Sequence, residues 1–493
     1  MTLDTVLLAG AGVLLAALGA ARLSSSLGLP SLLLFLFLGV GVGLWVEFDD
    51  AALAHDLGFA ALVLILAEGG FTTRWREMRP ILSLAGLLAT VGIGVSIAAM
   101  TVFGHFVLGL DLATSLLLGA ITAPTDSAAV FSVLRRVPIP GRIRAILEAE
   151  SGLNDAPVVL LVTAATAWAL GEGTQGPALI LGTVAFELLG GLAVGLVIGW
   201  IGARVHKRIA LPASGLYPLG AMGWALLADG AGAYLHVSGF AAVYICAVVL
   251  GNSDLPHRNA TKSFAEGVGW VAQIGLFVML GLLAHPERFS TEVLITGVLA
   301  GLFLTLVARP LSVWVCAVWF RMPWREQAFL SWAGLRGAVP IIMATVPLAS
   351  PLPQAQHLFN LVFVFVVVYT TLQAPTLGWV ARWLGVTTGD DAVDIEVEVA
   401  PLDKIQADFM QIKVPSGSKL HGVTVFELRL PPSTVVSLII RDGTPFAPGS
   451  RDVIRTGDEL LVVVPSRYRY RVENRFKQIS RGGRLSRWHD ERD

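Results

Sequence analysis

The chain has 493 residues, a net charge of −1, 55% hydrophobic residues and 14% charged residues. Together with a mean hydropathy of +0.71, this composition indicates a membrane protein rather than a series of soluble domains. Both cysteines, Cys246 and Cys316, lie inside apolar runs, which excludes a disulfide framework and a Cys/His metal site and leaves packing as their role.

Thirteen apolar runs are long enough to cross a bilayer as helices, which takes about 17 to 25 residues. They cover 5–22, 30–47, 53–71, 81–108, 112–134, 146–170, 178–203, 213–231, 235–251, 263–284, 291–320, 326–348 and 356–384. We expect the first run to be a span and not a signal peptide, because Asp4 precedes it instead of a basic cluster and further spans follow at once.

The charges in the loops predict the orientation of these spans. Alternate loops contain nearly all the Arg and Lys residues, whereas the other loops contain Arg288 and a group of acidic residues. Because positive charge gathers on the cytoplasmic side, we expect a multi-pass protein of the cell (inner) membrane with its N-terminus outside and its C-terminus inside. The basic loops are explained as topology signals, so no nucleic-acid partner is expected.

The composition becomes polar after about Thr387, where an acidic linker over 388–402 is expected to precede a small cytoplasmic α+β domain over 403–475. Three short β-rich segments separated by turn signals lie in this domain, at Phe409–Val414, Val435–Ile440 and Glu459–Val464. A basic tail over 476–493 follows. We expect it to be solvated, with contact to anionic lipid headgroups as the alternative.

An ionisable residue near the bilayer centre costs about 2.5–3.5 kcal/mol unless it has a partner or a function, and few residues of the predicted spans are candidates for such a role. They are Glu68, Asp126, Glu150, Asp155, Glu187, Arg309 and Arg336. Asp155 is the strongest functional candidate. A buried carboxylate binds either a proton or, once deprotonated, a cation, and this exclusive occupancy couples two fluxes.

Helical spacing places Glu150 on the same face as Asn154, and Ser151 on the same face as Asp155, because residues four apart are neighbours. Arg309 lies in the middle of its span and needs a carboxylate partner. Glu150 is the expected partner, in a pair that is structural rather than catalytic.

The other acidic residues carry weaker signals. Glu68 lies near the cytoplasmic end of the third span, and a site role and simple snorkelling remain equally open. Glu187 has no motif around it, so a structural role is favoured. Glu148 is expected to be a first-turn carboxylate outside the site.

Two spans are predicted to be broken helices. Pro124 lies beside Thr125 and Asp126 in the fifth span, and Arg336 is flanked by glycines and by Pro340 in the twelfth. Broken helices are tolerated in a membrane where they line a polar cavity. The breaks lie seven spans apart, which predicts inverted repeats formed by spans 1–6 and 8–13, with the site at their interface.

Four motifs occur in order in the expected spans: Thr125-Asp126, Glu150-Ser151 with Asn154-Asp155, Ala308-Arg309, and Gly334-Leu335-Arg336-Gly337. With them, residues 5–385 resemble the monovalent cation/proton antiporter family, in the Asn-Asp branch that includes bacterial NhaP-type and animal sodium/proton exchangers. The resemblance implies electroneutral exchange of one cation for one proton. It also implies a homodimer in which a core bundle moves like an elevator against a dimerisation domain.

The same resemblance implies roles for individual residues. Asp155 is the carboxylate shared by cation and proton, and Arg336 compensates helix ends where spans five and twelve cross. The further cation ligands are Asp126, Thr125, Ser151 and Glu68. The structural ion bridge consists of Glu150, Asn154 and Arg309. No transition metal and no cofactor are implied, because K⁺ or Na⁺ and H⁺ are the transported substrates.

The soluble domain resembles the C-terminal lobe of the RCK regulatory domain, TrkA-C, in the segments that begin at Val414, Leu428 and Ile454. This combination is typical of NhaP2-like potassium/proton antiporters and implies a small regulatory ligand such as a nucleotide. The glycine repeat Gly39–Gly43 lies inside the second span and indicates helix packing, so NAD binding is not predicted.

The sequence therefore predicts an electroneutral antiporter of K⁺ or Na⁺ against H⁺ that serves cation and pH homeostasis. A Na⁺(Li⁺)/H⁺ antiporter without K⁺ preference is the alternative. A cation channel gated by the TrkA-C domain is less favoured, because the chain has no selectivity-filter sequence of the Thr-Val-Gly-Tyr-Gly type. An enzyme is not expected, because no nucleophile/base pair or metal cluster stands out. The expected partners are monovalent cations, protons and membrane lipids.

Overall fold

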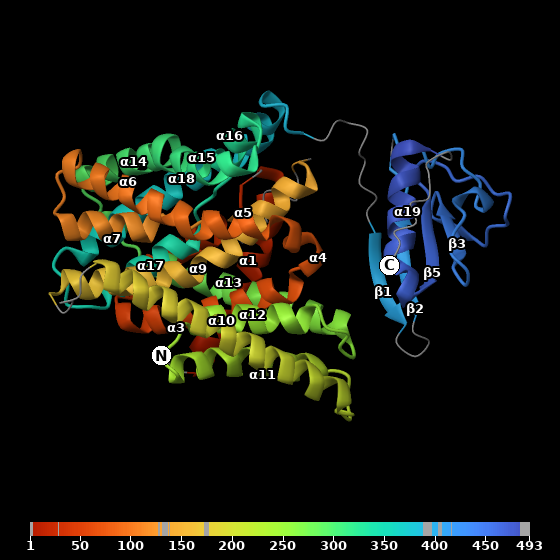
Figure 1. The fold of residues 1–493 in the computed structure, drawn as a ribbon, viewed down its shortest axis with the longest axis horizontal. Helices are drawn as coiled ribbons and strands as arrows, with labels where there is room; N and C mark the ends of the chain where they lie inside the picture. Colours follow the sequence, from red (N-terminus) through yellow and green to blue (C-terminus); the bar gives the residue numbers. More distant parts are fainter. Residues whose placement is uncertain are drawn as a thin grey trace. The chain divides into compact units, whose positions relative to one another are not determined.

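The computed structural model describes residues 3–27, 29–126, 129–130, 137, 139–171, 177–387, 397–402, 407–415 and 417–483. The chain divides into two compact units, Met1–Thr387 and Thr388–Asp493, which are described separately. The first unit is helical and the second is a small α+β domain (Figure 1).

The helical unit begins with α1 (Leu3–Leu27), α2 (Ser31–Gly43), α3 (Ala51–Thr72), α4 (Trp75–Met78), α5 (Leu82–Leu87), η2 (Leu88–Gly92), α6 (Ile93–Phe106) and α7 (Leu112–Thr122). It continues with α9 (Gly141–Ala169), α10 (Pro177–Arg208), α11 (Leu216–Tyr234), α12 (Gly239–Gly251) and α13 (Arg258–Leu283). The last elements are α14 (Thr291–Phe303), η4 (Leu304–Ala308), α15 (Arg309–Ala317), α16 (Trp324–Trp332), α17 (Ala338–Leu348) and α18 (Ala355–Trp383).

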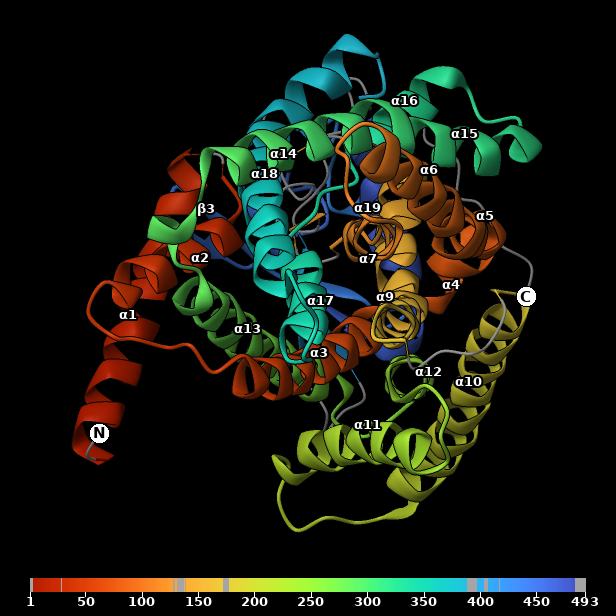
Figure 2. The ribbon, with the colours of Figure 1, turned by 90° about the vertical axis from the view of Figure 1, so that its left-hand side faces the viewer.

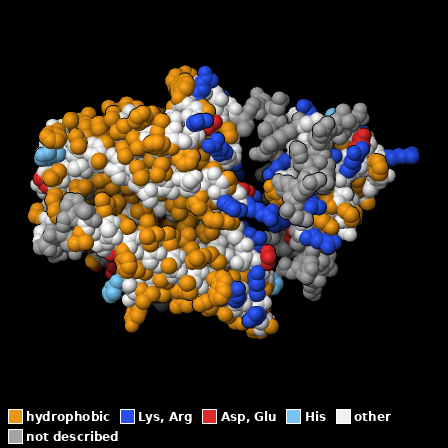
Figure 3. Space-filling view, viewed as in Figure 1, with side chains coloured by type: hydrophobic (Ala, Val, Ile, Leu, Met, Phe, Trp, Pro, Cys, Tyr) orange, Lys and Arg blue, Asp and Glu red, His pale blue; other side chains and the backbone are white. Residues whose placement is uncertain are grey.

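The helices coincide with the apolar runs of the sequence and confirm a polytopic helical membrane protein. Within the described ranges, eight helical segments are long and apolar enough to cross a bilayer, and shorter apolar helices occupy further predicted spans. Hydrophobic side chains cover most of the visible face of the helical unit (Figure 3). Asp50, Asp111 and Ser290 cap α3, α7 and α14 by accepting a backbone N–H at 2.9, 3.0 and 3.2 Å.

Both predicted breaks are confirmed. α7 ends at Thr122, directly before the Pro124 motif. The twelfth span is divided into α16 and α17 by the non-helical residues 334–337 around Arg336. The second half of the fifth predicted span, including Ser127, lies largely outside the described residues.

The helices pack in two groups. α2, α3 and α10–α13 pack mainly on one another, and we call them, together with α1, the scaffold group. α5–α7, α9 and α14–α18 form the site group. Seen from the end, α9 lies between α7 and α17 on one side and α12 on the other (Figure 2). The site group therefore meets the scaffold group at α9 and at α17, which packs on α3 and α13.

The second unit contains an antiparallel sheet with the strand order β1-β2-β5-β3-β4 and one helix. Its elements are β1 (Val397–Leu402), β2 (Ala407–Lys413), β3 (Val435–Arg441), β4 (Thr444–Phe446), β5 (Glu459–Pro465) and α19 (Arg469–Gly482). The three predicted β-rich segments are confirmed as β2, β3 and β5. Two boundaries differ from the prediction. β1 lies in the segment expected to be a linker, because it pairs with β2, and α19 continues the fold into the expected tail.

α19 belongs to the domain because one of its faces is apolar. Val472, Phe476 and Ile479 recur at helical spacing and are fully buried in the core of the sheet domain. Arg475 is also buried, and its Nε donates to the carbonyl of Leu428 at 3.0 Å. This part of the basic segment is therefore folded and not solvated, whereas residues 484–493 lie outside the described residues.

Candidate functional site

The middle of α9 contains four polar side chains that are almost completely buried. They are Glu150, Ser151, Asn154 and Asp155, each at most 3% exposed. Buried polar groups require partners, and the partners of this cluster come from chain segments that lie far away in the sequence. The break after α7 supplies the nearest of them.

Thr125 joins the break to α9. Its hydroxyl lies 2.8 Å from the Ser151 hydroxyl and accepts a hydrogen bond of 2.8 Å from the Asn154 side-chain amide. The same amide donates to the Thr125 carbonyl at 3.3 Å. The unwound segment thus places a hydroxyl and a carbonyl oxygen directly beside the α9 cluster, and both are suitable ligands for a hard monovalent cation.

Asp126 connects the two broken helices. Its carboxylate accepts the N–H of Ala338, the first residue of α17, at 2.7 Å, and its own N–H donates to the carbonyl of Leu335 at 3.0 Å. A Cβ atom at Gly337 would overlap the Asp126 carboxylate, so only glycine permits this approach. Backbone N–H groups at the start of a helix stabilise a negative charge. The start of α17 can stabilise the Asp126 carboxylate in this way.

Asp155 differs from Asp126 because it has no such support. It is 3% exposed, and its Oδ1 atom has no hydrogen-bond partner in the part of the chain that the structure describes. The charge of Asp126 acts on it. The structure therefore combines a buried carboxylate that has an unpartnered oxygen with a second carboxylate and two hydroxyl groups within one cluster.

Glu150 has a different environment from Asp155. Both of its carboxylate oxygens accept hydrogen bonds from the Arg309 guanidinium, at 2.5 and 2.8 Å. This is the pair expected from the sequence. The third expected member of the bridge, Asn154, donates to Thr125 instead, as described above.

Arg336 lies at the crossing of the broken helices. It donates to the carbonyl of Ala123, the C-terminal cap residue of α7, at 2.6 Å. A cation at this point opposes the partial negative charge of the helix end. The charge compensation that the resemblance implies for Arg336 stays a prediction.

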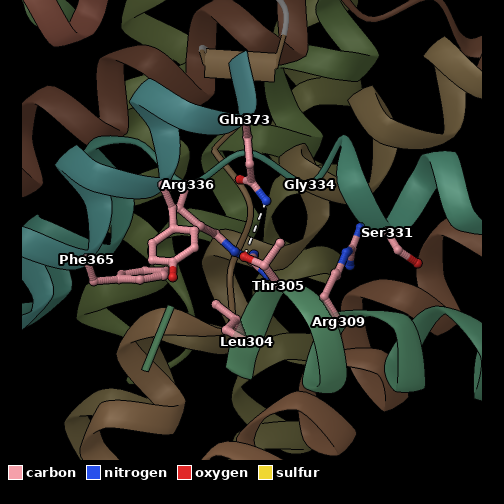
Figure 4. A pocket seen from close by; sticks show the side chains of 9 residues that line it. Leu304, Thr305, Arg309, Ser331, Gly334, Arg336, Phe365 and Gln373 are labelled. Carbon is pink, nitrogen blue, oxygen red and sulfur yellow. Dashed lines mark hydrogen bonds between the residues drawn. The ribbon is translucent and has the colours of Figure 1, made fainter. Parts of the chain in front are cut away.

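A small cavity of about 10 Å³ lies beside the cluster, with Arg309 and Arg336 in its wall (Figure 4). The side chain of Gln373 points across it and donates to the Thr305 hydroxyl at 3.3 Å (Figure 4). The Arg336 guanidinium in its wall repels a cation, so this cavity is unsuitable as the cation site. The Thr125 and Asp155 cluster is the better candidate.

Comparison with known families identifies the helical unit. The family described as "Sodium/hydrogen exchanger, transmembrane" matches residues 13–383, and the TrkA-C domain matches residues 409–477. The chain belongs to the sodium/hydrogen exchanger family. Its function is therefore cation/proton antiport, as the sequence predicted.

Two curated relatives match almost the whole chain. The chain is 32% identical to the K(+)/H(+) antiporter NhaP2 of Shewanella oneidensis over 475 residues, which is 94% of this chain and 82% of the relative. It is also 32% identical to the K(+)/H(+) antiporter NhaP of Alkalimonas amylolytica, over 93% of this chain and 81% of the relative. The fold resembles the sodium proton antiporter MjNhaP1 of Methanocaldococcus jannaschii, with a TM-score of 0.67 and 23% identity over 78% of this chain and 99% of that structure.

Two acidic residues of the exchanger lie on helices of the scaffold group. Glu68 is on α3 with its carboxylate beside Gly269 of α13, where a Cβ atom would lie 2.9 Å from the Glu68 Oε2. Glu187 is half-buried on α10, and its carbonyl accepts the N–H of Ser238. The role of Glu68 as a cation ligand stays a prediction.

Several groups at the exchanger's site were not identified from the sequence. The Thr370 hydroxyl of α18 donates to the carbonyl of Arg336, and Gln373 lines the neighbouring cavity. Both are uncharged polar residues in an apolar span, and this signal was available in the sequence. The carbonyl of Leu335 and the N–H of Ala338 leave no such signal, because every residue has these groups.

Proposed function

We propose that the chain exchanges one K⁺ for one H⁺ across the cell membrane. Asp155 alternately binds the proton and the cation. The observation that carries this proposal is the Asp155 carboxylate oxygen that has no hydrogen-bond partner among the described residues, in the same cluster as Thr125 and Ser151. The chain that contains this cluster belongs to a family of cation/proton exchangers. K⁺ is chosen because two relatives with 32% identity are named K(+)/H(+) antiporters and because the TrkA-C domain accompanies the exchanger unit.

The charges in the cluster support an electroneutral stoichiometry. Arg309 neutralises Glu150, backbone groups engage the Asp126 carboxylate, and Asn154 is uncharged. Asp155 is then the single carboxylate that exchanges its occupant. Such a site carries one positive charge in one direction as a proton and one in the other direction as a monovalent cation. No net charge crosses the membrane in a complete cycle.

The remaining expectations form part of the same proposal. The site group moves like an elevator against the scaffold group within a homodimer, and α9 and α17 form the contact between the groups. The N-terminus lies outside and the TrkA-C domain lies in the cytoplasm, as the alternating loop charges favour. In that domain we expect a small ligand, such as a nucleotide, to regulate exchange.

The test is exchange by the full chain in proteoliposomes that contain a pH-sensitive dye. Added K⁺ should dissipate an imposed proton gradient at the same rate whether or not the membrane potential is clamped. Dissipation by Na⁺ and Li⁺ with no preference for K⁺ would replace the proposal with the Na⁺(Li⁺)/H⁺ alternative. A rate that depends on the membrane potential would contradict the stoichiometry, and no response to any of these cations would contradict antiport.

A further inference from the structure

Tyr244 of α12 lies directly against α9, one turn before Asp155. A Cβ atom at Gly152 would lie 3.0 Å from the Tyr244 hydroxyl and 3.2 Å from its ring carbon Cζ. The Tyr244 side chain is 5% exposed. Glycine is a poor helix former in the middle of a helix, and the close approach of the Tyr244 ring explains its presence in α9.

Gly152 lies between two carboxylates on one face of α9. Glu148, Gly152 and Asp155 follow one another at positions i, i+4 and i+7, so their side-chain directions coincide. At 1.5 Å of rise per residue, Glu148 and Asp155 are about 10 Å apart along the helix axis. The charges of both carboxylates act on the Tyr244 phenol. Tyr244 therefore lies between the outer and the inner carboxylate of this stripe.

The hydroxyl of Tyr244 makes only weak contacts. It lies 3.5 Å from the Thr73 hydroxyl and 4.0 Å from the Met78 sulfur. The Thr73 hydroxyl already donates to the carbonyl of Gly69 at 2.7 Å. The Tyr244 oxygen thus has spare capacity for a stronger partner, such as a water molecule or a partly dehydrated cation.

We propose that Tyr244 is the gate between Glu148 and the cation site, and that its hydroxyl guides the ion past the ring. This inference rests on the proposed function of Asp155. The ring belongs to the scaffold group and Gly152 belongs to the site group. Movement between the groups would therefore open and close the contact, and Tyr244 acts as a positioning residue through this contact.

The first experiment measures the access of reagent to Asp155 in the full chain. A water-soluble carbodiimide and glycine ethyl ester convert exposed carboxylates to amides, and mass spectrometry locates the modified residues. We expect Tyr244→Ala to accelerate modification of Asp155 by about tenfold or more, since the shielding ring is gone, while Tyr244→Phe keeps the wild-type rate. Asp56, which is exposed on α3, serves as the internal reference.

The second experiment measures turnover in proteoliposomes. Gly152→Ala places a methyl group against the ring and should lower kcat about tenfold with little change in KM, because the overpacked contact resists movement. Alanine is the better helix former, so α9 itself is not weakened. The double variant Gly152→Ala/Tyr244→Ala should return to the turnover of Tyr244→Ala. Tyr234→Ala, which removes an exposed ring of α11, is the matched control.

The outcomes separate this inference from the function on which it rests. Unchanged Asp155 modification in Tyr244→Ala, or wild-type turnover in Gly152→Ala, would overturn the gate. A wild-type chain without exchange would contradict the proposed function, and the modification rates would still decide whether Tyr244 shields Asp155. If Tyr244→Ala does not fold, the turnover of Gly152→Ala compared with wild type and with Tyr234→Ala still decides the question.

Discussion

The guanidinium of Arg309 binds both carboxylate oxygens of Glu150, at 2.5 and 2.8 Å. The two side chains are 5% and 3% exposed, so bulk water hydrates neither charge. The pair joins α15 to α9, and Glu150 lies a little more than one helical turn before Asp155. Its role is to fix the helix that presents the exchanging carboxylate, since it leaves no free oxygen on Glu150 for a cation.

Replacing Arg309 should destabilise the exchanger. In Arg309→Ala the Glu150 carboxylate remains buried without its partner, which costs about 3–5 kcal/mol for a buried pair. We expect a clearly lower thermal denaturation midpoint and lower expression of the full chain. Arg204→Ala is the matched control, because Arg204 is exposed and lies over the ring of Trp200.

The double variant Glu150→Leu/Arg309→Leu distinguishes a lost charge partner from lost packing. With both charges removed, no desolvated ion remains, so the midpoint should exceed that of Arg309→Ala. A midpoint for Arg309→Ala equal to that of Arg204→Ala would show that the pair does not stabilise the fold.

Asp155→Asn should abolish exchange and leave the protein folded. The amide has nearly the same shape as the carboxylate, but it neither binds a proton at physiological pH nor neutralises a cation. We expect an unchanged elution profile and no dissipation of a proton gradient by K⁺. The control is Asp56→Asn, because Asp56 is exposed on α3 and should retain wild-type exchange. Exchange by Asp155→Asn would refute the assigned role.

Thr125 allows a finer test of the cation ligands. Thr125→Ala removes the hydroxyl that contacts Ser151 and accepts the Asn154 amide. A hydrogen bond or ligand contact to a charged species contributes about 1.5–3 kcal/mol, so KM for the cation should rise about tenfold or more. Thr125→Ser retains the hydroxyl and should remain within a few-fold of wild type. Equal KM values for the two variants would remove the hydroxyl from the list of ligands.

Much of the site could be predicted because charges inside apolar runs are rare. Asp155 and Arg309 stood out in this way, and Pro124 indicated the broken helix beside them. The partner of Asn154 could not be predicted from spacing. Periodicity along α9 pairs it with Glu150, but its amide donates to Thr125, because the unwound segment has a free carbonyl oxygen and a hydroxyl at that point.

The soluble domain shows which boundaries a local pattern misses. β1 has no turn signal separating it from the acidic linker, and it becomes a strand only through its pairing with β2. α19 contained a usable signal, since Val472, Phe476 and Ile479 repeat at i, i+4 and i+7. The many arginines between them suggested a solvated tail. The segment forms a helix of the domain instead, because these three apolar side chains are buried in its core.

Asp458 of the sheet domain gives a prediction that depends on pH. Burial raises the pKa of this carboxyl, but hydrogen bonds from Arg441 and from the Arg455 N–H outweigh burial and lower its pKa below the ordinary value of 3.8. Arg441 donates to both carboxylate oxygens at 2.8 Å, and the Arg455 N–H donates at 2.7 Å. Because the pKa is lower in the folded state, the ionised carboxylate stabilises the domain.

The sign of the effect follows from this shift. The stabilisation is complete above pH 3.8 and is lost as the pH falls through the lower folded-state pKa. Asp458→Asn should therefore destabilise the domain by about 2 kcal/mol near neutral pH, a value reduced for the partly exposed Arg441. Hydrogen exchange of the β3 and β5 amides in the full chain would be about 30-fold faster in the variant. The difference should disappear in strong acid, and Asp442→Asn, at a neighbouring turn, should cause no such change. A difference between Asp458→Asn and wild type that persists in strong acid would contradict the ionised pair as its cause.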